Sequence, residues 1–452
     1  MGKEVIKINI SKEDDHVFHR NLNLEYPIID RAEGVYLYES SGKKFIDGCS
    51  GAVAANLGHG VTQITDAMNQ QAKKAAFVHS LRFETEVLYK LSKEIIDLAP
   101  KNFSKVFYTC SGSEANESAI KLVHQYHKDR GNEFKRLIVG RWQSYHGNTL
   151  GTLSIGGDLK RRTSFSALLY EHPHINSPIT DNEDMSLTNY IDELESLIKN
   201  YGAENIGAII CEPIVGSQQG AMVPPYEYFK RIKDICKKND LLLIIDEVMT
   251  GFGRTGKNFA IEYFDVIPDI ITFGKGVTGG YAPLGGIIVH NDIVKAILEN
   301  SNGIFKHGFT YSGHPVLVAT GLAAINYYKS NDILYNCNIQ SEYLLKGLNQ
   351  IYDKYKMIKS INGKGLLIGL EFVPNRDHDK DFKASEKVSE RLNQISMENG
   401  LVLYPGSGAK KGKLGQHIII APPLTVNNTE IDEILEILDK SLLKLQKEIN
   451  YN

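Results

Sequence analysis

Two short apolar runs near the middle of the chain constrain its fold more than any other feature. Leu241–Ile245 reads LLLII, and Ile270–Phe273 reads IITF. Apolar runs of this length, rich in branched side chains, predict strands buried on both faces of a helix-covered sheet. The first run ends at Asp246 and Glu247, and the second ends at Lys275, which lies between two glycines. Side chains at the carboxyl ends of such strands lie where open α/β sheets bind ligands.

Asp246 and Lys275 together indicate one cofactor chemistry. A lysine amine in a sheltered site can form a Schiff base with an aldehyde. Pyridoxal 5′-phosphate (PLP) is the common aldehyde cofactor, and an aspartate keeps its ring nitrogen protonated. Each residue also has an ordinary explanation, because an aspartate can cap a helix and a loop lysine can be solvated. The pair at two strand ends favours a PLP site.

Composition limits the class of protein. The chain has 452 residues, of which 42% are hydrophobic and 23% charged, values that fit a globular protein of two or three domains. The formal net charge of -3 gives no reason to expect a nucleic-acid partner or an acidic membrane surface. Because no apolar run is long enough to span a bilayer, we also expect no membrane segment.

The cysteines and histidines argue against a disulfide framework and a metal site. The five cysteines form no CxxC pair, and the histidines lack metal-ligand spacing. An odd number of scattered thiols is typical of a reducing compartment, so a cytoplasmic location is expected.

Apolar runs alternate with segments of helical periodicity along most of the chain, which predicts an α/β fold with a parallel sheet. We expect three parts, and the boundary between the second and the third lies near the start of a long helix predicted from Ile333. These are an N-terminal segment at 1–60 that contributes to a small domain, a large PLP-binding domain at 61–330, and a small C-terminal α+β domain at 331–452.

Further strand ends carry candidate ligand contacts. Gly112 and Ser113 lie between a strand and a helix, where free N–H groups and the helix dipole favour a phosphate. A simple N-cap by Ser111 or Ser113 is the alternative explanation. Tyr145 follows a strand and could cover a cofactor ring or simply pack in its loop. Glu212 also directly follows an apolar strand.

Two glycine-rich stretches invite other interpretations. Residues 251–256 read GFGRTG and fit the GxGxxG dinucleotide fingerprint, but two acidic residues precede them and no clear helix follows. Residues 408–413 read GAKKGK, lack the spacing of a Walker loop, and are expected to form a mobile surface loop.

The motifs resemble those of the class III, or ω-amino-acid, aminotransferases, which are fold-type I PLP-dependent enzymes. The resemblance runs from about residue 25 to the last helix, in the order SGSEANESAIK, YHG, CEP, IIDEVMTGFGRTG, FGKGVTGGYAPLGG, HGFTYSGHP and APPL. It implies a large domain with a mostly parallel seven-stranded sheet covered by helices, plus a small α+β domain. The implied activity moves an amino group from an amine or ω-amino acid to a 2-oxo acid such as pyruvate or 2-oxoglutarate.

The resemblance also implies roles for matching residues. Lys275 would form the Schiff base with PLP and move the substrate proton. Asp246 would pair with the pyridine nitrogen, Val248 would pack behind the ring, and Tyr145 would stack in front of it.

Other implied roles concern the phosphate and the assembly. Gly112 and Ser113 would hold the phosphate, and Glu212 would order the site near the cofactor hydroxyl. Thr310 would reach the phosphate of a neighbouring subunit, which implies a homodimer with shared active sites.

Two departures from the family pattern concern the substrate. Val53 stands where many members have tryptophan, and Tyr404 stands where many have an arginine that binds a substrate carboxylate. Either another group takes that role or the substrates differ. The candidate groups are Arg82 and the lysines of a later loop, namely Lys410, Lys411 and Lys413.

Two rival functions stay open at this point. The first is a PLP-dependent amino-acid racemase or aminomutase on the same fold. The second, more remote, is a non-catalytic dinucleotide-binding protein built on the GFGRTG turn.

Overall fold

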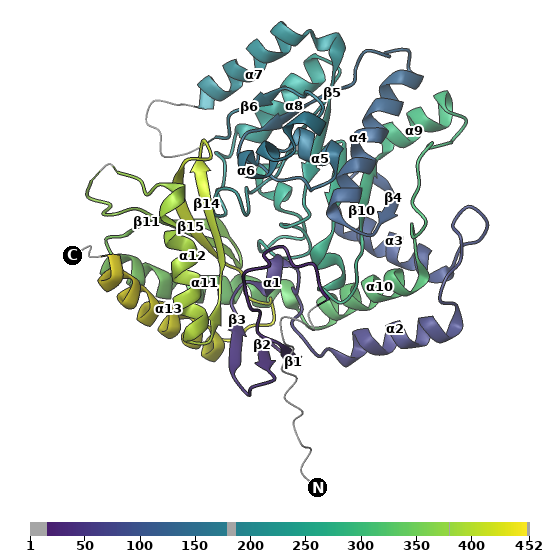
Figure 1. Cartoon of the computed structure of the whole chain (residues 1–452). Helices are drawn as coiled ribbons and strands as arrows, with labels where there is room; N and C mark the ends of the chain where they lie inside the picture. Colours follow the sequence, from purple (N-terminus) through teal and green to yellow (C-terminus); the bar gives the residue numbers. More distant parts are fainter. Residues whose placement is uncertain (1–15, 179–186, 379, 450–452) are drawn as a thin grey trace.

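A seven-stranded sheet forms the centre of the protein (Figure 1). The computed structural model describes residues 16–178, 187–378 and 380–449, so the first fifteen residues of the expected N-terminal segment lie outside it. In spatial order the strands are β4 (Phe103–Thr109), β10 (Gly285–His290), β9 (Ile270–Phe273), β8 (Leu242–Asp246), β7 (Ile206–Cys211), β5 (Leu137–Arg141) and β6 (His174–Ile175).

The sheet is mostly parallel, as the apolar runs predicted. Parallel pairing joins β9, β8, β7, β5 and β6. β10 departs from this pattern, because it is antiparallel to both β9 and β4. The reason is its connection: the segment between β9 and β10 contains a short 3-10 helix, η4 (Lys275–Thr278), in place of the long crossover that a parallel strand requires.

Helices cover both faces of this sheet. Along β8, Leu243 and Ile245 pack on one face, while Leu242 and Ile244 pack on the other, so the strand is buried on both sides as predicted. The first face is covered by α3 (Glu86–Leu98), α7 (Leu187–Tyr201), α8 (Tyr228–Lys238) and α10 (Pro315–Ser330). The second is covered by α4 (Gly112–Asp129), α5 (Leu150–Ile155) and α9 (Asn291–Asn300).

The C-terminal part packs around a second core. Its antiparallel sheet has the order β11-β12-β15-β14, and three long helices accompany it. The elements are α11 (Ile333–Lys354), β11 (Ile358–Lys364), β12 (Leu367–Phe372), α12 (Val388–Glu398), β13 (Leu401–Val402), β14 (Tyr404–Lys410), β15 (Leu414–Ile420) and α13 (Asn428–Ile449).

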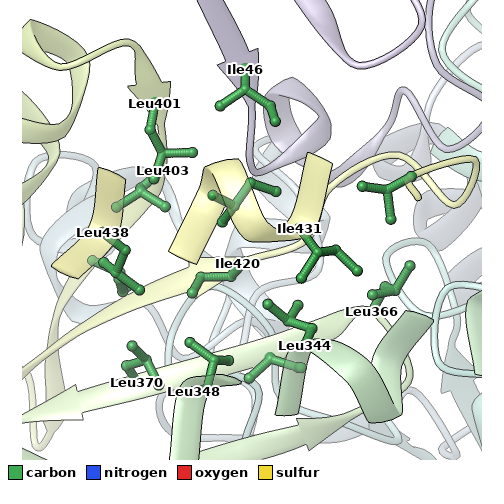
Figure 2. Packing of buried hydrophobic residues seen from close by; sticks show 14 of the residues in the cluster. Ile46, Leu344, Leu348, Leu366, Leu370, Leu401, Leu403, Ile420, Ile431 and Leu438 are labelled. Carbon is green, nitrogen blue, oxygen red and sulfur yellow. The ribbon is translucent and has the colours of Figure 1, made fainter. Parts of the chain in front are cut away.

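The N-terminal strands join this C-terminal part. β1 (Ile29–Glu33), β2 (Tyr36–Glu39) and β3 (Lys44–Asp47) form a sheet with β13, in which β3 and β13 run parallel. Figure 2 shows Ile46 of β3 in one hydrophobic cluster with Leu401 and Leu438, so both ends of the chain build that core. The expected boundaries after residues 60 and 330 stay predictions. The chain continues from β3 through α1 (Ser50–Val53) and α2 (Thr62–Lys74).

One expectation about local structure is wrong. Residues 408–413 are not a loop throughout, because β14 extends to Lys410 and pairs with β15 across a tight turn. Lys410 forms ion pairs with Asp381 and Glu371, which hold the end of this hairpin in place.

No helix in the described residues has both the length and the apolar character needed to cross a membrane.

Candidate active site

A pocket of about 160 Å³ lies at the carboxyl ends of the central strands. Its wall includes the ends of β7, β8 and β9, the start of α4 and the loop after β5, so segments distant in sequence meet there. Seven of the residues singled out from sequence line it: Gly112, Ser113, Tyr145, Glu212, Asp246, Val248 and Lys275.

Asp246 is held in one orientation by three hydrogen bonds. Its side chain is nearly fully buried, at 5% exposed. Oδ2 accepts a hydrogen bond from Nδ2 of Asn116 and lies 2.8 Å from Nδ1 of His146, while Oδ1 accepts from the backbone N–H of Val248 at 3.0 Å. Because each carboxylate oxygen can accept two hydrogen bonds, Oδ1 retains capacity for one donor from a ligand.

Asn116 and His146 form a supporting layer that sequence reasoning missed. Asn116 on α4 also donates to the carbonyl of His146 and accepts from Oγ1 of Thr272 on β9, each at 2.8 Å. Nε2 of His146 is buried and has no hydrogen-bond partner within the described residues. The available signal was position: Asn116 lies one turn into the helix that follows the Ser-Gly-Ser segment, and His146 lies within the YHG motif.

Lys275 lies directly after β9, at the first position of η4. Its φ of 39° is in the left-handed region, which is costly for a residue with a side chain and is common at functional sites. Burial lowers the pKa of Lys275 to about 8, although the nearby charges of Asp246 and Glu212 oppose that effect. At pH 7 roughly a tenth of such an amine is neutral, far more than for an exposed lysine.

Glu212 follows β7 and ties two loops of the pocket together. Its Oε1 accepts from the backbone N–H of Tyr145 at 2.6 Å, and Oε2 accepts from that of Gly216 at 3.1 Å. Burial raises the pKa of Glu212, while the nearby Arg141 guanidinium acts in the opposite direction. Its contacts make it an organiser of the pocket wall.

The start of α4 provides a place for an anion. Ser111 caps the helix by accepting from the N–H of Glu114, which leaves the N–H groups of Gly112 and Ser113 without partners inside the helix. A methyl group on Gly112 would lie 2.7 Å from Cγ1 of Val248, so glycine is required for this close approach. A helix N-terminus beside a narrow pocket favours a phosphate.

Tyr145 is half-buried and forms another part of the pocket wall. The guanidinium carbon of Arg161, on α6 (Leu159–Thr163), lies 4.9 Å from the centre of its ring. Burial raises the pKa of Tyr145, and the charge of Arg161 partly counters this.

Seven residues singled out from sequence do not line the pocket, and three of them are Lys410, Lys411 and Lys413. Thr310 and Arg82 are exposed in loops. Val53 is fully buried in a small cluster with Ile214 and Ala421, and the ring of Tyr404 packs against that cluster. Ile214 lines the pocket, so the cluster to which Val53 and Tyr404 belong reaches the pocket wall.

The GFGRTG turn does not have the structure of a dinucleotide site. Such a site requires a helix that opens at the last glycine, whereas the chain here continues through turns into the short 3-10 helix η3 (Ala260–Phe264). Arg254 is fully buried at its centre. It donates hydrogen bonds to the carbonyls of Leu366 and Pro422 and to the side chains of Ser50 and Asn56.

The residues present fit PLP. The pocket offers an amine with a lowered pKa, a fixed carboxylate with a free acceptor position, an aromatic wall, and a helix N-terminus for the phosphate. Among the described residues there is no cluster of histidine, cysteine, aspartate and glutamate suited to a metal ion. A mostly parallel seven-stranded sheet with this pocket is the architecture of fold-type I PLP-dependent enzymes.

The chain belongs to the class III aminotransferases, since the family described as "Aminotransferase class-III" matches residues 18–442. It is similar to "Gamma aminobutyrate transaminase 2" of Solanum lycopersicum, at 36% identity over 93% of this chain and 92% of that protein. It is also similar to "Putrescine--pyruvate aminotransferase" of Pseudomonas aeruginosa, at 35% identity over 92% and 90%.

Solved structures agree with this family. The ω-transaminase of Pseudomonas jessenii in complex with PMP superposes with a TM-score of 0.88, at 30% identity over 95% of both chains. The protein is therefore an aminotransferase, and its family depends on PLP.

Proposed function

We propose that this protein transfers an amino group from an amine or ω-amino acid to a 2-oxo acid such as pyruvate or 2-oxoglutarate, using PLP carried by Lys275 as a Schiff base. One observation carries the proposal: Lys275 and Asp246 line the same pocket, at the ends of adjacent strands. The names of two relatives, one for γ-aminobutyrate and one for putrescine with pyruvate, support this range of donors and acceptors.

PLP, when bound, supplies an aldehyde that condenses with amines and a ring that withdraws electrons from the substrate carbon. The protein supplies the proton transfers. Nζ of Lys275 is the base that accepts a proton from the substrate carbon and later returns it, and its lowered pKa keeps a useful fraction neutral near pH 7. Asp246 provides the fixed negative charge that favours a protonated ring nitrogen.

The remaining pocket residues bind and orient. The N–H groups of Gly112 and Ser113 would hold the phosphate, Val248 would support one face of the ring, and Tyr145 would cover the other and exclude water. Glu212 fixes the Tyr145 loop through its backbone hydrogen bond.

We infer a homodimer in which Thr310 reaches the partner's phosphate. Thr310 is exposed and lies outside its own subunit's pocket, and the nearby side chains of Phe77 and Tyr311 form an exposed aromatic pair. Exposed apolar side chains next to a residue of this role favour a subunit contact. A cytoplasmic location is part of the same proposal, because all five cysteines are free thiols.

An absorbance titration tests the function. Purified protein should show the visible band of a PLP Schiff base, and a donor amine added without acceptor should convert it durably to the band of the aminated cofactor. Adding pyruvate should restore the first band. A cofactor band that no amine shifts, together with racemisation of an amino acid, would contradict the transaminase proposal.

A further inference from the structure

Within the described residues, the pocket lining offers the carboxylate of an oxo acid no cation apart from Lys275. Lys275 is the one lysine or arginine among the residues that line it in the described part of the chain, and Lys275 is committed to the cofactor in the proposed function. Glu212 and Asp246 both contribute negative charge there. A substrate carboxylate entering this pocket therefore requires a cation at the mouth to offset its loss of hydration.

Of the cations considered from sequence, Arg82 is exposed in a loop and does not line the pocket. Lys410 is paired with Asp381 and Glu371, and Lys411 and Lys413 are exposed at the hairpin turn. Tyr404 has a phenol in place of a cationic side chain, and it packs against the cluster that contains Val53.

We propose that Arg161 on α6 binds the carboxylate of the oxo-acid acceptor at the mouth of the pocket. This inference rests on the proposed function and assigns one of its substrate contacts. Arg161 lies against Tyr145, with 4.9 Å between its guanidinium carbon and the centre of that ring, so it borders the pocket wall directly.

The guanidinium of Arg161 is held with one edge available. Nε lies 2.8 Å from Oδ2 of Asp158, the buried N-cap of α6, and Nη1 donates to Oδ1 of Asn148 at 3.3 Å. Nη2 forms no hydrogen bond to any described residue, and the side chain is 31% exposed. Asp158 engages Nε and Asn148 accepts from one N–H of Nη1, so the second N–H of Nη1 and both N–H groups of Nη2 are left to donate to a carboxylate.

The neighbouring cations are differently engaged. Lys160 donates to Oγ of Ser407 on β14 at 2.6 Å, and this contact docks α6 on the C-terminal sheet (Figure 1). Arg162 donates to three backbone carbonyls, which makes it structural. Arg20 contributes charge near Tyr145 but is an exposed residue of the N-terminal segment.

The test compares acceptors with and without a carboxylate. Holoenzyme is first converted by a donor amine and then mixed with pyruvate or with acetaldehyde, which lacks the carboxylate, and the return of the first absorbance band is followed. We expect Arg161→Gln to raise the apparent KM for pyruvate by about 10- to 100-fold, as the loss of a charged bidentate contact implies. The value for acetaldehyde should change less than about twofold by the same reasoning, because no carboxylate is involved.

Three variants and a binding measurement separate this role from others. Arg161→Lys should recover part of the pyruvate affinity, whereas Arg20→Gln and Lys160→Gln should leave the pyruvate preference near that of the wild type. Calorimetric titration of the holoenzyme with propanoate should show binding that Arg161→Gln loses.

Some results would overturn the assignment. These are an unchanged KM for pyruvate in Arg161→Gln, equal losses for both acceptors, a larger effect in Arg20→Gln or Lys160→Gln, or loss of cofactor as the sole change. Failure of the proposed function gives a different result, namely a wild-type protein with no cofactor band, or with a band that no donor amine converts.

Discussion

Replacing Asn116 by alanine should weaken both the protein and its hold on the cofactor. Asn116 is 1% exposed and makes three hydrogen bonds of 2.8 Å, to Oδ2 of Asp246, to the carbonyl of His146 and from Oγ1 of Thr272. Water cannot easily replace this side chain, so its three partners each lose a hydrogen bond inside the protein.

The size of the effect follows from these contacts. A hydrogen bond to a charged group contributes about 1.5–3 kcal/mol and each neutral one about 0.5–1.5 kcal/mol, so we expect a loss of about 3–5 kcal/mol in the free energy of unfolding. Asp246 keeps its contacts with His146 and Val248 and is therefore loosened rather than released. Cofactor affinity should fall by roughly tenfold or more, because each loss of about 1.4 kcal/mol in binding free energy weakens binding tenfold.

The substitution Asn116→Asp keeps the shape but puts a second carboxylate within hydrogen-bond distance of Asp246. Because two adjacent carboxylates disfavour joint ionisation, we expect a larger loss of cofactor affinity than in Asn116→Ala. Gln125→Ala is a matched control on the same helix, since Gln125 is also mostly buried and bonds to the backbone of Ile304 and Lys306 away from the pocket.

Urea unfolding and cofactor release during dialysis measure the two effects separately. Gln125→Ala should lose stability while retaining the cofactor. The reasoning is refuted if Asn116→Ala retains the cofactor as well as Gln125→Ala does.

Three further predictions concern pH and close packing. Burial raises the pKa of Glu247 to about 7, so the folded state is penalised as pH rises from about 4.5 to 7. The free energy of unfolding measured by urea titration should fall over that range by on the order of 3 kcal/mol, and Glu247→Gln should flatten the change. The rate of cofactor uptake by the apoprotein should rise with pH, with a midpoint around pH 8, as Lys275 loses its proton. Glu212→Gln should move that midpoint to lower pH, because Glu212 raises the pKa of Lys275, and stopped-flow absorbance would measure both rates. Gly276→Ala would place a methyl group 2.4 Å from Nδ2 of Asn56, so thermal unfolding should reveal a loss of about 1–3 kcal/mol together with a lower turnover rate.

Much of the architecture could be predicted from local sequence. The apolar runs at β8 and β9 identified strands buried on both faces, and the polar residues after them placed Asp246 and Lys275 at one edge of the sheet. The direction of β10 could not be predicted in the same way, because its residues pack alike in either direction and its short connection decides the outcome.

The supporting contacts of the site depend on tertiary packing. Asn116 looks like an ordinary polar position of an amphipathic helix, and its role appears when α4 packs against the sheet beside Asp246. The partners of Lys410 and the position of Arg161 beside Tyr145 likewise depend on how distant segments meet. No local pattern of residues reports such distances.

Borohydride reduction followed by peptide mapping tests the central claim most directly. Reduction fixes a Schiff base permanently to the lysine that carries it. We predict that the phosphopyridoxyl group appears on the peptide that contains Lys275, and that Lys275→Ala yields no labelled peptide while still binding some cofactor reversibly. Labelling of a different lysine in the wild-type protein, or no labelling after the cofactor is added, would contradict the assignment of Lys275.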